Sequence, residues 1–140
     1  MTASLARAST QLQTFFEKGA RDRLSGTALK AFRRLCEFWN LNNAEAAALL
    51  GVSQSTWDRM KTSKWVGELT QDQLTRVSAL VGVYKGLHLL FADAMADRWP
   101  KLANKAPLFE RVSPVEAMIE GGIPRMLETR QYVDALRGGL

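Results

Sequence analysis

The side chains best suited to chemistry lie in one short stretch of the sequence, directly after Gly51. Hydroxyl and amide groups there can exchange hydrogen bonds with base edges, and cationic groups can reach guanine or neutralise phosphates. We expect six of these residues to contact DNA: Ser53, Gln54, Ser55, Arg59, Lys61 and Lys64. Asp58 suits a phosphate-facing surface poorly, although its carboxylate could orient Arg59.

The sequence offers little for other kinds of chemistry. Its single cysteine, Cys36, lies in an apolar stretch, so the chain can form no internal disulfide or cysteine-based metal cluster, and a buried thiol is expected. Its single histidine, His88, also lies among apolar residues and is expected to be packed or at the rim. Residues 109–140 lack paired carboxylates at catalytic spacing and a nucleophile beside a base. We therefore expect no enzyme activity, no metal and no cofactor, and a small enzyme built around His88 is disfavoured.

The polar residues belong to a pattern typical of a helix-turn-helix. Two helices that cross steeply need a small residue where they touch, a glycine at the turn and apolar residues that hold the second helix. Ala47 and Gly51 meet the first two needs, and the spacing resembles that of phage-repressor-like regulators, whose second helix enters the major groove. The apolar set is Leu50, Val52, Trp57 and Met60. Trp57 is bulkier than the branched aliphatic residue usual at its place, and an ordinary pair of packed helices is the alternative.

The net charge of +5 is unevenly placed. Residues 1–65 contain ten Lys or Arg against five Asp or Glu, whereas residues 66–140 contain nine of each. A basic first half favours a polyanion such as DNA as its partner, and a neutral second half favours a partner of another kind. On charge alone, an imbalance that arose by chance is an equal alternative.

Periodicity and capping residues predict helices along the whole chain. Residues 1–23 are weakly periodic, and a short amphipathic helix there would use Leu12, Phe15 and Phe16. The run Ser25-Gly26-Thr27 predicts a break and an N-cap before a helix over 28–39. Three further helices are expected over 44–50 after an Asn43 cap, from the Ser53 cap to about Lys61, and over 71–98 after a Thr70 cap. Gly82 and Gly86 allow a bend or break in the last of these.

Two short helices are expected to close the chain. Residues 99–109 contain two prolines and are predicted to form a loop with at most one helical turn. Ser113, Pro114 and Glu116 form a predicted capping box, and the helix that follows should stop at Gly121-Gly122. The last helix starts at Pro124, ends at Gly138-Gly139 and is expected to bury Met126, Leu127, Tyr132, Val133 and Leu136.

Because no β-type alternation persists, the predicted fold class is all-α. We expect a basic helix-turn-helix domain over residues 1–66 and a second, small helical domain over 67–140. The apolar helix over 74–91 is the best candidate for a dimer surface, although such a helix is more often simple core. No apolar run approaches the roughly 20 residues of a membrane span, and no secretory signal is recognised, so a cytoplasmic protein without a membrane partner is expected.

The second half of the chain resembles a known family. Ser113-Pro114, a short helix, Gly121-Gly122 and then residues 124–139 are similar to the toxin-binding domain of Xre/MbcA/ParS-type antitoxins. Residues 65–91 resemble the linking helical region of the same proteins. The resemblance runs from about Ala28 to the end, and its C-terminal pattern is more specific than the helix-turn-helix, which many families share.

The resemblance implies an antitoxin that pairs with a RES-type toxin, an enzyme that consumes NAD, and it makes residues 67–140 the expected domain for dimerisation and toxin binding. Its C-terminal end would cover the active site of the toxin, and its N-terminal half would repress the shared operon by binding double-stranded operator DNA. A two-fold symmetric operator would need a homodimer, or a complex whose symmetry the toxin helps to supply. Residues in the matching motif are the implied toxin contacts: Arg130, Tyr132, Asp134, Arg137, Gly138 and Gly139. Tyr132 could equally be core, and Arg130 could lie on a solvated face.

Leu140 joins these contacts by a chemical argument. A cleft that holds the phosphates of NAD should attract an anion such as the carboxylate at Leu140, and Arg137 could pair with a catalytic acid. A different overall interpretation is a plain helix-turn-helix repressor whose C-terminal half only dimerises. Both interpretations predict DNA binding.

Overall fold

The computed structural model describes residues 18–138, and its side chains from residue 22 onward. This part of the chain contains six α-helices, one short 3₁₀ helix and no strand, so the predicted all-α class is confirmed. The elements are α2 (Lys18–Phe38), α3 (Asn43–Leu50), α4 (Gln54–Met60), α5 (Gln71–Leu90), α6 (Asp93–Arg98), η1 (Trp99–Lys101) and α7 (Pro114–Arg137). The helix expected around Leu12, Phe15 and Phe16, and the toxin contacts Gly139 and Leu140, lie outside the described residues.

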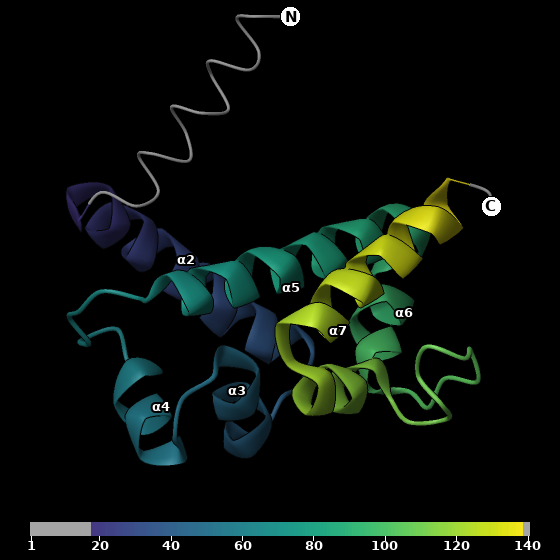
Figure 1. Cartoon of the computed structure of the whole chain (residues 1–140), viewed down its shortest axis with the longest axis horizontal. Helices are drawn as coiled ribbons and strands as arrows, with labels where there is room; N and C mark the ends of the chain where they lie inside the picture. The colour runs from purple at the N-terminus through teal and green to yellow at the C-terminus, as the bar shows by residue number, and fades with distance from the viewer. Residues whose placement is uncertain (1–17, 139–140) are drawn as a thin grey trace, which may run out of the picture.

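Helix α5 is the centre of the arrangement. It crosses the middle of the molecule, α2 packs beside it, α7 lies along its second half, and α3 and α4 lie together below its first half (Figure 1). The predicted cap at Thr70 is confirmed, because its side chain accepts a hydrogen bond from Gln73 N and Gln73 completes a capping box. The apolar face of α5 is used in the core, since five of its large side chains are buried: Leu74, Val77, Leu80, Val83 and Leu87.

The predicted break at Ser25-Gly26-Thr27 is wrong, because α2 runs through all three residues. Ser25 is fully buried, and its hydroxyl accepts a hydrogen bond of 2.7 Å from the backbone N–H of Leu69. The hydroxyl of a serine inside α2 therefore provides the hydrogen-bond acceptor for a backbone N–H in the segment just before α5. The local sequence is typical of a helix cap, but the role of Ser25 is set by a long-range contact that the sequence does not reveal.

Two predicted helix ends also need correction. Asn42, rather than Asn43, caps α3, and Glu45 completes a capping box there. The helix expected over 71–98 ends at Leu90, and a separate helix, α6, follows after Phe91 and Ala92. Gly82 and Gly86 bring no break, since both lie within α5 at its contact with α7.

The C-terminal pair of helices is one element with a kink. Gly122 adopts φ 65° and ψ −152°, a backbone conformation that favours glycine, and Pro124 starts the second half. The Ser113 cap is confirmed, but the hydroxyl of Ser113 itself contacts the Glu116 carboxylate at 3.3 Å. Met126 and Val133 are buried as expected. Leu127 and Leu136 are exposed, so these two core assignments are wrong.

Candidate DNA-binding surface and C-terminal helix

The turn between α3 and α4 is built around Gly51. Its φ of 79° and ψ of 36° are left-handed, which confirms that the turn falls at this glycine, and its N–H donates to the carbonyl of Ala48 at 3.2 Å. The N–H of Val52 donates to the carbonyl of Ala47 at 3.0 Å. These two bonds form a Schellman motif, which satisfies the last carbonyls of α3 and sends the chain sharply into α4.

The short helix α4 is anchored by buried residues on one side. Trp57 and Met60 are almost fully buried, and the Trp57 ring meets Phe32 of α2 edge to face at 5.4 Å. Leu50 of α3 is fully buried and Val52 is half-buried. The apolar set of the predicted helix-turn-helix is therefore core, and the bulk of Trp57 is accommodated by its aromatic neighbour.

The opposite side of α4 faces solvent. All six residues predicted to contact DNA are exposed: Ser53, Gln54, Ser55, Arg59, Lys61 and Lys64. The structure thus brings them together on the solvent side of α4 and the segment that follows, where base and phosphate contacts are sterically open. Their role in DNA binding stays a prediction.

Some of these side chains have partners within the protein. Ser53 caps α4, accepting a hydrogen bond from Thr56 N at 3.1 Å, and its hydroxyl donates to Thr56 Oγ1 at 3.0 Å. The Asp58 carboxylate pairs with Lys61 at 3.2 Å, and the Arg59 guanidinium donates to Oγ1 of Thr56 at 3.4 Å. Because the Asp58 and Lys61 side chains are both well exposed, their pairing is weak and a phosphate could replace it.

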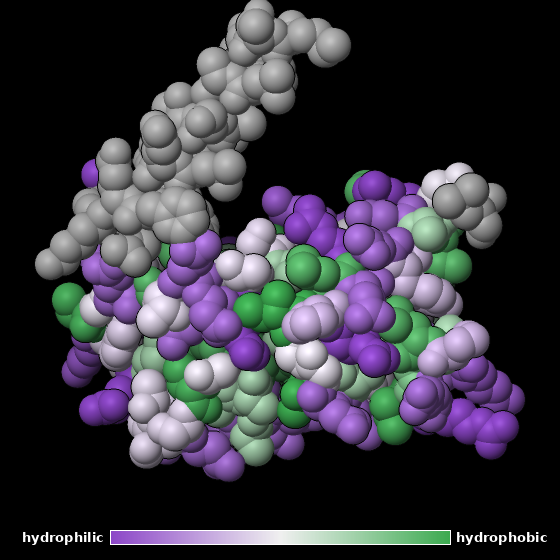
Figure 2. Space-filling view, in the orientation of Figure 1, coloured by the Kyte–Doolittle hydropathy of each residue, from purple (hydrophilic) through white to green (hydrophobic). Residues whose placement is uncertain are grey.

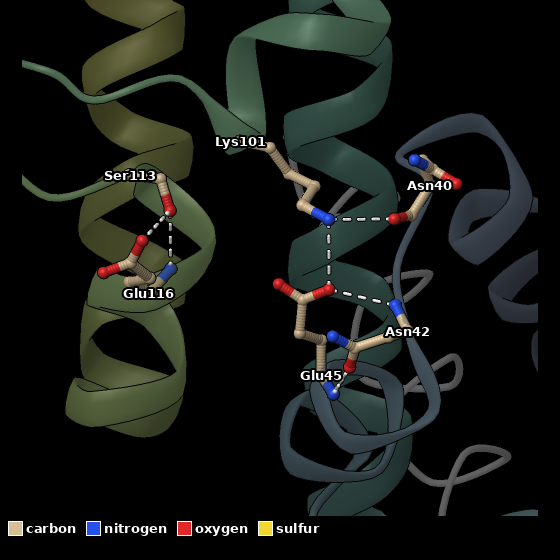
Figure 3. Close-up of polar contacts among 6 residues, drawn as sticks. All are labelled: Asn40, Asn42, Glu45, Lys101, Ser113 and Glu116. Atoms are coloured by element: carbon tan, nitrogen blue, oxygen red, sulfur yellow. Dashed lines mark hydrogen bonds and ion pairs between the residues drawn. The ribbon is translucent and has the colours of Figure 1, made fainter.

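The helix-turn-helix is held by two basic residues that the sequence analysis did not single out. Arg76 of α5 bonds to Asp72 at 2.8 Å and reaches the carbonyl of Leu49 at 3.3 Å, near the C-terminus of α3, where a positive charge is favourable. Lys101 of η1 donates to the carbonyl of Asn40 at 2.9 Å and to Glu45 at 3.2 Å (Figure 3). Because their backbone partners lie 27 and 61 residues away in the sequence, neither contact could be predicted from local sequence.

Figure 3 shows that the Glu45 carboxylate makes two contacts at the start of α3. Its carboxylate accepts from the N–H of Asn42 at 2.9 Å, which closes the capping box, and also receives the ammonium group of Lys101. Ser113 and Glu116 form the cap of α7 in the same view. Lys101 therefore links the segment after α6 to the first helix of the helix-turn-helix.

The predicted toxin contacts divide between two sides of α7. Arg130, Asp134 and Arg137 are exposed, and they recur at spacings of four and three residues, so they share one face of the helix. Arg137 lies 3.6 Å from Asp134, and Gly138 forms the C-cap.

Tyr132 lies on another side of α7 and is half-buried. Its ring stacks near Trp99 at 6.3 Å and meets Phe109 edge to face at 5.3 Å. These aromatic contacts attach the segment between α6 and α7 to the last helix. The structural role of Tyr132 is therefore shown, whereas its contact with a toxin stays a prediction.

The single cysteine and the single histidine both have structural roles. Burial raises the pKa of the Cys36 thiol to about 12, so it is a protonated core side chain, as expected. His88 lies at the rim between Asp93, 3.0 Å from Nδ1, and Asp97, 2.8 Å from Nε2. Burial lowers the pKa of His88, but the two carboxylates outweigh it and raise the pKa above its ordinary value.

Within residues 18–138, no group of three or more His, Cys, Asp or Glu is arranged to hold a metal ion. In the same part of the chain, every helix is too short or too polar to cross a membrane.

Comparison with known proteins agrees with this geometry. Residues 19–82 match the antitoxin Xre-like helix-turn-helix domain, a stretch that runs from α2 through the first half of α5. Residues 19–82 therefore form a helix-turn-helix domain of the antitoxin Xre-like type, a domain family that is not a family of enzymes. The matched stretch extends past residue 66, and the predicted division at 66/67 stays a prediction.

One relative covers most of the chain. The uncharacterized protein y4oB of Sinorhizobium fredii is 34% identical over 113 residues, which span 79% of this chain and 84% of y4oB. The chain belongs to the same family as y4oB. No solved structure matches it.

Proposed function

We propose that this protein is the antitoxin of a bacterial type II toxin–antitoxin pair, with two binding surfaces. The first is the exposed side of α4, which would enter the major groove of operator DNA and repress the operon. The second is the exposed face of α7 with the tail that follows, which would cover the active site of a RES-type toxin that consumes NAD. The observation that carries the DNA-binding part is the set of six exposed polar and basic residues on α4 and the segment after it. Ser53 caps this helix, and Trp57 and Met60 bury its other side.

The DNA-binding part is supported by the two sides of α4, one buried against the core and the other exposed. Its buried residues, Trp57 and Met60, fix the helix to α2, and Gln54 and Arg59 lie on the exposed side, where they can face base edges. Lys61 and Lys64 follow on the same exposed segment and suit phosphates. The test is a gel-shift assay with the duplex upstream of the gene. Gln54→Ala should lower the preference for this duplex over a scrambled one, whereas Lys64→Ala should weaken binding to both.

The toxin-binding part is supported by charges on α7 that the fold leaves exposed. Arg130 and Arg137 are cationic, and Asp134 between them is anionic, so this face can complement a cleft that contains both a catalytic acid and phosphate-binding donors. The RES-type toxin is proposed because the C-terminal sequence pattern resembles antitoxins of that group. The tail beyond Gly138 would supply Gly139 and Leu140 to the same cleft.

Co-expression with the product of the neighbouring gene tests this part. The wild-type chain should restore growth, and Arg130→Glu combined with Arg137→Glu should abolish the rescue. Glu128→Lys is the matched control, since Glu128 is exposed on α7 but lies about half a turn away from Arg130. Rescue by the double variant at the wild-type level would favour the plain repressor, in which this half of the chain only dimerises.

Self-association is also proposed, because a two-fold symmetric operator needs two reading helices. An open apolar groove of about 380 Å³ lies between α2 and α5, and Phe38 at its edge is 44% exposed although its ring stacks on Tyr84. Apolar residues also gather between polar ones over the middle of the face shown in Figure 2. Light scattering of the purified protein should give twice the monomer mass, and Phe38→Arg should lower it.

A further inference from the structure

Arg33 of α2 holds the C-terminal end of α4. Its Nε donates to the carbonyl of Met60 at 3.0 Å, and its Nη2 donates to the same carbonyl at 2.7 Å and to the carbonyl of Thr62 at 2.6 Å. Three of the five guanidinium N–H groups are thereby used on two backbone acceptors. These bonds join residues that are 27 and 29 positions apart in the sequence.

The contact with Arg33 fixes the C-terminal end of a short helix. Helix α4 has only seven residues, and its last carbonyls have no partners within the helix. Its N-terminal end is fixed by the Gly51 turn, and Trp57 and Met60 anchor one side. Arg33 fixes the remaining end and places a positive charge at the helix C-terminus, where the helix dipole favours it. The direction of α4 relative to α2 is therefore set at both ends.

A planar guanidinium suits this task better than an ammonium group. The fork of Arg33 reaches two carbonyls at once in a fixed geometry, whereas lysine is a point charge on a flexible stem. The neighbouring Arg34 provides a comparison. It is exposed on α2, and it lines the groove toward α5 with Phe38 and Tyr84, away from α4.

We propose that Arg33 is a positioning residue for DNA reading, which sets the angle at which α4 presents Gln54 and Arg59 without touching DNA itself. This inference rests on the proposed function of α4 as the reading helix. An error in the angle of a short helix displaces the side chains that face base edges. Phosphate contacts, which adapt through long flexible chains, are less sensitive to it. Loss of Arg33 should therefore reduce sequence discrimination more than overall affinity.

The test uses full-length Arg33→Lys, which keeps the charge, and Arg33→Met, with Arg34→Lys and Arg34→Met as matched controls. A duplex that the wild-type protein selects from a random pool is compared with a scrambled duplex of the same composition, at a temperature where circular dichroism shows each variant folded. Arg33→Lys should lose roughly tenfold in the ratio of the two affinities, about 1.4 kcal/mol. Its affinity for the scrambled duplex and its salt dependence should stay as in the wild type, and Arg34→Lys should keep the full ratio.

Each other outcome overturns the proposal. If Arg33→Lys keeps the full ratio, the geometry of the guanidinium is irrelevant to reading. If Arg33→Met weakens both duplexes equally and lowers the salt dependence while Arg33→Lys is unaffected, Arg33 acts as a phosphate contact. If the wild-type protein selects no sequence from the pool, the proposed role of α4 fails and the inference fails with it.

Discussion

Arg130 of α7 lies directly across Gly82 of α5. A Cβ added at Gly82 would lie 2.5 Å from Arg130 Nε, and one turn later a Cβ added at Gly86 would lie 2.8 Å from Cγ1 of Val133. Two glycines four residues apart thus create the place where α7 crosses α5. The last helix, which carries the proposed toxin contacts, approaches the centre of the fold through this pair.

The two glycines should respond differently to alanine. Val133 is fully buried and cannot move aside, so Gly86→Ala should lower the free energy of unfolding by about 1–3 kcal/mol. Arg130 is exposed and can swing into solvent, so Gly82→Ala should be close to neutral, because the gain in helix propensity of up to about 1 kcal/mol offsets the displacement. Urea denaturation of both variants checks this. Equal losses in both would contradict this, because they would mean that the Arg130 side chain cannot move away from position 82.

Gly26 offers a stabilising substitution. It lies inside α2, its surroundings are open, and a Cβ added there would meet nothing within 4 Å. Gly26→Ala should therefore raise the free energy of unfolding by about 0.5–1 kcal/mol, since alanine loses less backbone entropy in a helix. Thermal and urea unfolding measure the change. A loss of stability would mean that the helix does not continue through residue 26.

The sequence alone predicts much of the helix-turn-helix, because its determinants are local. Gly51, Ser53 and Thr70 act on residues within one turn of themselves, so their roles as turn and caps can be read from the sequence and are confirmed. The solvent side of α4 follows from the same periodicity. Its six polar residues are exposed as a consequence of where Trp57 and Met60 are buried.

The errors arise where distant residues decide the outcome. Ser25 looks like a cap, but its hydroxyl serves Leu69, which is 44 residues away. Gly82 and Gly86 look like helix breakers because their packing partners on α7 are invisible to local rules. Arg33 cannot be distinguished from Arg34 by composition or spacing, and only the fold assigns one to α4 and the other to the α5 side.

Ser25 should be costly to replace. Its hydroxyl is the acceptor for the buried N–H of Leu69, and both residues are fully buried. Ser25→Ala removes the acceptor and leaves that N–H unsatisfied, so the free energy of unfolding should fall by about 1–3 kcal/mol. Gly26→Ala is the matched control, because it adds a methyl group at the next position and should have the opposite sign. An unchanged urea midpoint for Ser25→Ala would contradict the contact.

His88 should make stability depend on pH. In the folded protein the carboxylates of Asp97 and Asp93 raise its pKa, against the opposing effect of burial, whereas the unfolded chain keeps a pKa near 6.5. The imidazolium can donate to both carboxylates at once, and a neutral ring can donate to only one. This stabilisation is therefore complete below the unfolded pKa and is lost as the pH rises through the higher folded pKa.

Unfolding free energies measured in urea at about pH 5.5 and about pH 8.5 should differ more for the wild type than for His88→Asn, with the excess stability at the acidic pH. Asp97→Asn should remove most of this pH dependence, whereas Asp93→Asn should remove less, because Asp93 is 93% exposed and its charge is screened by water. An excess at the alkaline pH would contradict the assignment, since it would require the folded pKa of His88 to be lowered.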